Sequence, residues 1–233
     1  MSAKQDAGKN SLSVEPQYDL LYHVKEKHGI AQLGLMVNES WNQDPRRTLF
    51  TLARYKFVSK MFAGRESVLE VGCADAFGTR IVQQTVGRVT AVDFDPLFVQ
   101  DVKQRMNPHW EFEVAVHDML SGPVPGSFDA VYALDVLEHI EISDEEKFLA
   151  NCLGSLRPNG VAIFGMPSLE SQPYASPQSK EGHVNCKSMP VMKELMEKFF
   201  HTVFMFSMND ETVHTGYHKM AHYIIALCAD RRQ

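Results

Sequence analysis

The sequence contains few cysteines and no long apolar run. Its four cysteines, among 233 residues, are scattered, and no two of them form a Cys-x-x-Cys pair. This spacing disfavours a zinc knuckle or a disulfide framework, so we expect reduced, buried thiols in a cytoplasmic protein. No apolar stretch approaches the ~20 residues of a membrane-spanning helix, and the first residues lack the apolar core of a signal peptide.

Basic residues are also scarce. The chain carries 23 Lys and Arg against 29 Asp and Glu, for a formal net charge of −6, and its basic residues cluster only at Arg46-Arg47 and Arg231-Arg232. Because binding to phosphates needs a basic face, a nucleic-acid partner is disfavoured. Hydrophobic residues make up 44% and charged residues 22%, and the length suits one sizeable soluble domain.

Short apolar strands alternate with helical segments through most of the chain. We expect strands at 67–71, 88–93, 110–115, 128–134 and 160–166. We expect helices at 46–62, 78–86, 96–106, 143–156 and 189–199. This alternation predicts an α/β fold with a mostly parallel sheet and helices on both faces. Two further strands, at 202–207 and 221–228, have no helix between them, which predicts an antiparallel pair at one edge.

The chain divides into three parts by composition. Residues 1–17 are polar, and we expect a disordered tail. Residues 18–45 hold apolar residues at uneven helical spacing and are expected to form a helical segment or lid. The main domain is expected at 46–230, opening on the helix start signal Asp44-Pro45.

A strand, a small-residue turn and a helix start follow one another between Val68 and Thr79. Such a turn lets backbone N–H groups close on a nucleotide-like ligand. Glu70 stands two residues before Gly72, and Asp93 ends the next strand. A carboxylate about twenty residues past the turn can accept both ribose hydroxyls and disfavours a 2′-phosphate, so NADP is not expected. Two acids suit a cationic amino-acid ligand better than a pyrophosphate.

Ligands of open α/β sheets bind outside the carboxyl ends of the strands. We therefore expect cofactor contacts from strand-end and turn residues, namely Glu70, Gly72, Cys73, Ala74, Asp93, Phe94, Asp118, Met119, Leu134 and Asp135. Asp118 is placed to meet an adenine amino group, with Phe94 and Met119 as apolar walls.

These residues resemble the class I S-adenosylmethionine-dependent methyltransferases. The resemblance covers about residues 46–228 and rests on spaced motifs at 69–74, Asp93, 128–140 and 156–161. It implies a Rossmann-like three-layer sandwich around a seven-stranded sheet with an antiparallel last strand. It also implies S-adenosyl-L-methionine as the methyl donor and S-adenosyl-L-homocysteine as the product. The donor's amino-acid end would lie by Gly72, its ribose by Asp93 and its adenine by Asp118.

One departure from the family pattern concerns the turn. The family loop reads Gly-x-Gly-x-Gly, whereas Ala74 and Ala76 stand at its second and third glycine positions here. Because alanine is costly at positive φ, we expect ordinary backbone angles at both positions. Donor binding should survive, since no pyrophosphate has to approach the turn.

A second constellation is Asp135-x-x-Glu138-His139, followed by His183. On a helical turn, positions i and i+3 or i+4 share a face, so the first three side chains can converge. The ubiquinone-pathway O-methyltransferases and the small-RNA 3′-terminal 2′-O-methyltransferases have a similar set, which implies a divalent metal such as Mg²⁺ or Zn²⁺. Its ligands would be Asp135, Glu138, His139 and His183, with Asp135 in place of the usual glutamate. The expected catalytic residues are Glu138, His139 and His183, which would orient or deprotonate the acceptor. Without a metal, His139 or His183 could act as the general base. In metal-free relatives Glu138 and His139 serve helix capping and site polarity.

Two loops near the end of the chain differ in expected role. Residues 167–180 are polar with three prolines, and we expect a lid over the site. Residues 209–216 are expected to be a plain hairpin loop without a catalytic role.

These patterns predict an enzyme that transfers a methyl group to an oxygen or nitrogen of a small molecule, such as a sugar or a secondary metabolite. A metal-assisted RNA 2′-O-methyltransferase and a non-catalytic donor-binding protein stay open as alternatives. A nicotinamide-dependent dehydrogenase would need a Tyr-x-x-x-Lys pair, which the sequence lacks. A homodimer is an option that the sequence leaves open.

Overall fold

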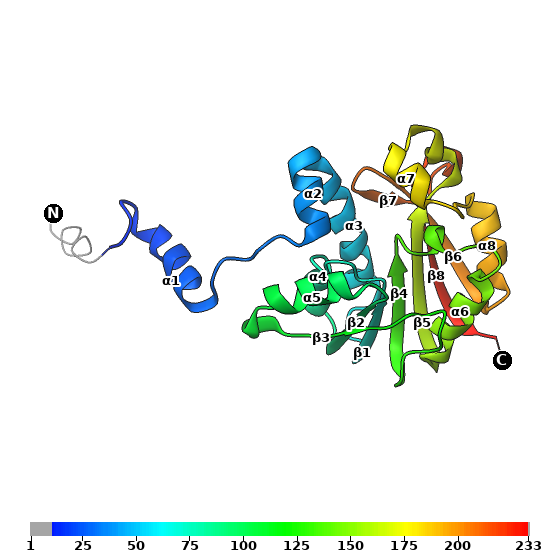
Figure 1. The fold of residues 1–233 in the computed structure, drawn as a ribbon, viewed down its shortest axis with the longest axis horizontal. Helices are drawn as coiled ribbons and strands as arrows, with labels where there is room; N and C mark the ends of the chain where they lie inside the picture. The colour runs from blue at the N-terminus through cyan, green and yellow to red at the C-terminus, as the bar shows by residue number, and fades with distance from the viewer. Residues whose placement is uncertain (1–10, 233) are drawn as a thin grey trace.

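The computed structural model describes residues 11–232, which form a three-layer α/β protein around an eight-stranded sheet (Figure 1). Along the sheet the order is β3-β2-β1-β4-β5-β8-β6-β7. The strands are β1 Ser67–Val71, β2 Arg88–Asp93, β3 Glu113–Val116, β4 Phe128–Leu134, β5 Leu156–Pro167, β6 Phe200–Asn209, β7 Thr212–His214 and β8 Tyr223–Arg231. The helices are α1 Asp19–His28, α2 Leu35–Gln43, α3 Arg46–Met61, α4 Thr79–Gln83, α5 Pro96–Arg105, α6 Glu145–Gly154, α7 Pro177–Gly182 and α8 Met189–Glu197.

The sheet is parallel from β3 to β5 and antiparallel beyond. Strand β8 runs against both β5 and β6 and lies between them. The expected α/β class and the reversed last strand are confirmed. The expected count of seven strands is one short, because part of the expected loop 209–216 forms β7, which pairs with β6 at the edge of the sheet.

Helices cover both faces of the sheet, as a central parallel sheet requires. Every residue of β1 is buried. On one face, Val58 of α3 and Val82 of α4 pack with Val68, and on the other, Phe148 of α6 and Met192 of α8 pack with Leu69. Neighbouring residues of β1 therefore serve opposite layers, which the alternation of side chains along a strand imposes.

Several expected boundaries shift, for local reasons. The strand expected from 110 begins at Glu113, because Pro108–Trp110 form a 3₁₀ turn. The helix expected to reach 86 ends at Gln83. The expected lid loop 167–180 is instead largely helical, with a 3₁₀ helix at Leu169–Tyr174 followed by α7. Serine side chains cap both, because Ser168 accepts from Ser171 N and Ser176 from Ser179 N.

The N-terminal segment contacts the rest of the fold at several points, among them His28 O, which accepts from Asn107 Nδ2 at 2.6 Å. Helix α1 projects away from the sheet and has no buried residue (Figure 1). The chain then runs to α2, where Val37 N donates to the Asp75 carboxylate at 2.8 Å. Of the expected disordered tail, residues 1–10 lie outside the described residues, and a 3₁₀ turn begins at Pro16.

Two further expectations concern the cysteines and membrane segments. All four cysteines are free, and three of them are buried. Among the helices of residues 11–232, none has both the length and the apolar character needed to cross a bilayer.

Candidate active site

The turn after β1 uses left-handed backbone angles at three alternate positions. Gly72 has φ 72°, Ala74 φ 44° and Ala76 φ 50°. The expectation of ordinary angles at the two alanines is therefore wrong. The turn is set by its anchors: Gly72 N and Cys73 N both donate to Val92 O, at 2.8 Å and 3.1 Å. Each alanine in this conformation costs about 1–2 kcal/mol.

Asp93 ties this turn to the end of β2. Its Oδ2 accepts from Ala74 N at 2.8 Å and its Oδ1 from Asp95 N at 2.9 Å. The ring of Phe94, beside it, is 74% exposed. The Asp93 carboxylate, only 5% exposed, thus fixes the turn, and the open ring of Phe94 follows it at the carboxyl edge of the sheet.

The other expected cofactor residues differ in exposure. Asp118 is exposed, and its Oδ1 accepts from Leu120 N at 2.8 Å. Met119, expected to be an open apolar wall, is instead only 4% exposed and belongs to the core. Cys73 and Leu134 are also buried, so their side chains shape the floor of the turn.

Glu70 is buried behind the turn. Its Oε2 accepts a hydrogen bond from the hydroxyl of Thr79, the first residue of α4. Burial raises the pKa of the Glu70 carboxyl to about 7, although the Thr79 bond acts in the opposite direction. This carboxyl links β1 to α4 and thereby holds the two ends of the turn together.

An ion pair that sequence reasoning missed lies at the carboxyl end of β4. Arg54 Nη1, from α3, lies 2.7 Å and 2.5 Å from the two Asp135 carboxylate oxygens. The guanidinium also stands 3.9 Å from the centroid of the Tyr223 ring. Asp135 itself has φ 57°. Asp135, expected among the metal ligands, is paired with Arg54 and is not part of the cluster of possible ligands formed by Glu138, His139 and His183.

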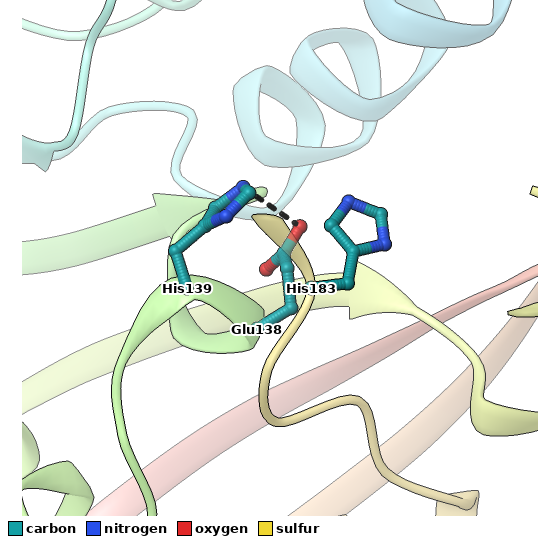
Figure 2. A group of neighbouring side chains, drawn as sticks. All are labelled: Glu138, His139 and His183. Carbon is teal, nitrogen blue, oxygen red and sulfur yellow. Dashed lines mark ion pairs between the residues drawn. The ribbon is translucent and has the colours of Figure 1, made fainter. Parts of the chain in front are cut away.

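Glu138, His139 and His183 converge next to this ion pair (Figure 2). One potential ligand atom from each of them lies within 4.8 Å of the others. The two imidazole rings have centroids 5.2 Å apart, so the structure brings both histidines together. Glu138 is fully buried, and neither of its carboxyl oxygens has a hydrogen-bond partner in the described structure.

Backbone contacts orient His139 within this group. Its Nδ1 lies 2.8 Å from the carbonyl oxygen of Gly182. Since a carbonyl oxygen can only accept, Nδ1 carries the hydrogen and Nε2 keeps a free lone pair. That Nε2 lies 4.0 Å from Glu138 Oε1. Burial raises the pKa of the Glu138 carboxyl and, with His139 nearby, lowers the pKa of His183.

A cavity of about 410 Å³ adjoins the other side of the turn. Residues 30–32 cover it, and Phe77, Arg80 and Trp110 stand in its wall. The Arg80 guanidinium lies 4.3 Å from the centroid of the Trp110 ring. None of Glu138, His139 and His183 lines this cavity, so it is separate from the histidine pair.

Known proteins share both the sequence motifs and this fold. The methyltransferase domain model matches residues 69–164. A probable S-adenosylmethionine-dependent methyltransferase of Mycolicibacterium smegmatis is 30% identical over 115 residues, 49% of this chain and 42% of that protein. A ubiquinone biosynthesis O-methyltransferase of Xanthomonas euvesicatoria is 27% identical over 146 residues, 60% of this chain and 59% of that protein. The N-methyltransferase NodS of Bradyrhizobium japonicum WM9 superposes with a TM-score of 0.59 at 19% identity, covering 82% of this chain and 99% of that one.

A mostly parallel sheet with a reversed strand inserted near one edge, shared with solved methyltransferases, defines a Rossmann-like fold. The match over residues 69–164, the similar sequences and the shared fold together support a class I S-adenosylmethionine-dependent methyltransferase domain in this chain. It spans about half the length of the curated relatives it matches.

Proposed function

We propose that the protein is an enzyme that transfers the methyl group of S-adenosylmethionine to an oxygen or nitrogen of a small molecule. The observation that carries this proposal is the position of the Glu138, His139 and His183 group beside the donor turn. Val136 joins the two, because a Cβ added at Gly72 would lie 2.3 Å from Val136 Cγ2. Groups able to bind or deprotonate an acceptor thus stand next to the turn where a donor would lie.

The charges around the turn suit the donor. Its amino-acid end carries one ammonium and one carboxylate, and Asp135 and Arg54 offer one charge of each sign at the end of β4. Asp93 would accept the ribose hydroxyls, Phe94 would cover the adenine and Asp118 would meet its amino group. Glu70, Gly72, Cys73, Ala74 and Leu134 would keep the turn in shape.

The chelating group suits a divalent metal. A buried carboxylate without a partner is costly unless it is neutralised, and the two imidazoles beside it provide the neutral nitrogen ligands that such ions accept. Glu138, His139 and His183 would hold the ion, leaving positions open for an acceptor. A bound divalent ion would polarise an acceptor oxygen and ease the loss of its proton. In a metal-free enzyme, Nε2 of His139 or His183 would take that proton directly.

Positioning supplies much of the acceleration in such a reaction. Methyl transfer from a sulfonium is an in-line displacement, so the donor methyl and the acceptor atom must be held in line. The turn would fix the donor, and the Glu138, His139 and His183 group would fix the acceptor. RNA is a less suitable acceptor, because the chain has a net charge of −6 and no basic cluster beyond two Arg pairs.

Calorimetry of donor binding tests the proposal. We expect S-adenosylmethionine to bind with a Kd below ~100 μM. Arg54→Met should weaken binding by about 10- to 100-fold, since a charge-assisted pair contributes about 1.5–3 kcal/mol. Arg157→Met is the matched control, because Arg157 pairs with Asp129 at the opposite end of β4. Absence of binding by the unaltered protein would refute the proposal.

Two further experiments test metal binding and catalytic turnover separately. Titration with Mg²⁺, Mn²⁺ or Zn²⁺ after chelator treatment tests the metal site, and Glu138→Gln should abolish the response. Release of S-adenosylhomocysteine with pools of hydroxylated or amino acceptors tests turnover. Donor binding without turnover on any pool would favour a non-catalytic donor-binding protein.

A further inference from the structure

We propose that Gln172 is a positioning residue that fixes the His183 imidazole in one tautomer, with Nε2 turned toward Glu138. The inference rests on the proposed function only for its effect on metal affinity. Gln172 lies in the 3₁₀ helix Leu169–Tyr174, in the segment expected to be a lid. Its Oε1 lies 2.9 Å from Nδ1 of His183.

The direction of this hydrogen bond follows from the other end of the amide. Gln172 Nε2 lies 3.1 Å from the carbonyl oxygen of Ser168. A carbonyl oxygen can only accept, so the amide nitrogen must face Ser168 and the amide oxygen must face His183. The His183 Nδ1 is therefore the protonated nitrogen. Its Nε2 keeps the lone pair that can bind a metal or take a proton.

Ser168 provides a rigid base for this contact. It is fully buried at the end of β5, and its Oγ donates to Ala221 O at 2.6 Å. Its backbone N donates to His222 O at 3.0 Å. The amide of Gln172 is thus hydrogen-bonded to a residue fixed at the end of the sheet, and it holds the imidazole in a defined position.

The chain after His183 is fixed independently. Asn185 N donates to Glu138 O at 3.0 Å, and Asn185 Nδ2 donates to Glu145 Oε2 at 2.9 Å. Lys187 Nζ lies 2.6 Å from the same Glu145 oxygen. Because these buried contacts hold the backbone near Glu138, the remaining freedom of His183 is the rotation and tautomer of its ring. Gln172 removes that freedom, as hydrogen-bond partners of metal-binding histidines do.

The test compares Gln172→Leu with Gln172→Glu, which keeps the accepting oxygen, and with Gln178→Leu, which alters an exposed glutamine of α7. Long-range ¹⁵N–¹H spectra of the metal-free protein at pH 8.5 report which His183 nitrogen carries the hydrogen. We expect Nδ1–H alone in the unaltered protein, in Gln172→Glu and in Gln178→Leu. In Gln172→Leu we expect both tautomers, with the circular dichroism melt retained.

Metal titration adds a second measurement. Gln172→Leu should weaken Mn²⁺ binding by about 10- to 100-fold and leave S-adenosylmethionine affinity unchanged, whereas a structural defect would lower both. A single Nδ1–H tautomer in Gln172→Leu would overturn the proposal. If the unaltered protein binds no metal, the metal part of the proposed function fails, and the tautomer comparison still decides the role of Gln172.

Discussion

Among the single residues, Glu70 should give the protein a distinctive pH response. Its pKa is raised from 4.5 to about 7 by burial. Between these values the folded protein binds a proton more tightly than the unfolded chain, so stability falls as pH rises through this window. The loss amounts to about 3 kcal/mol by pH 8.

Glu70→Gln removes this titration, so the free energy of unfolding of the variant should depend less on pH than that of the unaltered protein. Urea unfolding at pH 5 and pH 8 measures it: the variant should gain about 2.5 kcal/mol on the unaltered protein between the two values. Other titrating groups are common to both proteins and cancel in the difference. An equal effect of the substitution at both pH values would mean that Glu70 is ionised without cost in the fold.

The sequence predicts the positions of some site residues but not of others, for physical reasons. Strand ends and helical spacing predict where Asp93, Glu138 and His139 lie, and the family resemblance adds His183, which the structure places beside Glu138 and His139. Arg54 could not be found this way, since it meets Asp135 across 81 positions and nothing in its local pattern points there. The left-handed angles of Ala74 and Ala76 were not predicted, because the hydrogen bonds of their N–H groups, to Asp93 Oδ2 and Cys73 O, depend on the folded turn and not on alanine's own preference.

At the scale of elements, the β1–α4 turn requires a glycine at position 72. Gly72 and Gly64 both have positive φ, of 72° and 82°. A Cβ at Gly72 would lie 2.3 Å from Val136 Cγ2, whereas a Cβ at Gly64 would meet nothing within 4 Å. Both alanine variants carry a left-handed cost of about 1–2 kcal/mol. Gly72→Ala adds about 1–3 kcal/mol of overpacking.

The measurement is chemical unfolding of Gly72→Ala and Gly64→Ala, together with donor calorimetry. Gly72→Ala should be the less stable and should bind S-adenosylmethionine more weakly, because Val136 lies between the turn and Glu138. Gly64→Ala should keep the donor affinity of the unaltered protein. Equal losses in the two variants would show that backbone angle alone, and not the contact with Val136, limits the turn.

The elements themselves were predictable where burial decides them. The strands 67–71, 88–93 and 128–134 match β1, β2 and β4, because continuous apolar runs between polar turns leave few alternatives. The 3₁₀ helix Leu169–Tyr174 and α7 were not predicted, since their short serine- and proline-rich sequence carries no apolar periodicity and their caps are local. Strand β7 was missed because only its pairing with β6 makes three residues a strand.

For the whole molecule, β8 should be indispensable and α1 dispensable. β8 pairs with β5 along one side and β6 along the other, whereas α1 has no buried residue. A chain ending at His222 should therefore lose cooperative thermal unfolding. A chain lacking residues 1–28 should melt within a few degrees of the unaltered protein. Calorimetric scans of both truncations test this, and a cooperative transition without β8 would contradict it.

The placement of β8 also determines the order in which strands can pair while the chain is being synthesised. Strands β1 to β5 can pair as they leave the ribosome, since each finds its neighbour among residues already made. β5 and β6, by contrast, must wait with open edges until residues 223–231 have emerged. Open strand edges are sites of mispairing. A nascent chain paused between β6 and β8 is therefore the form of this protein most in need of a chaperone.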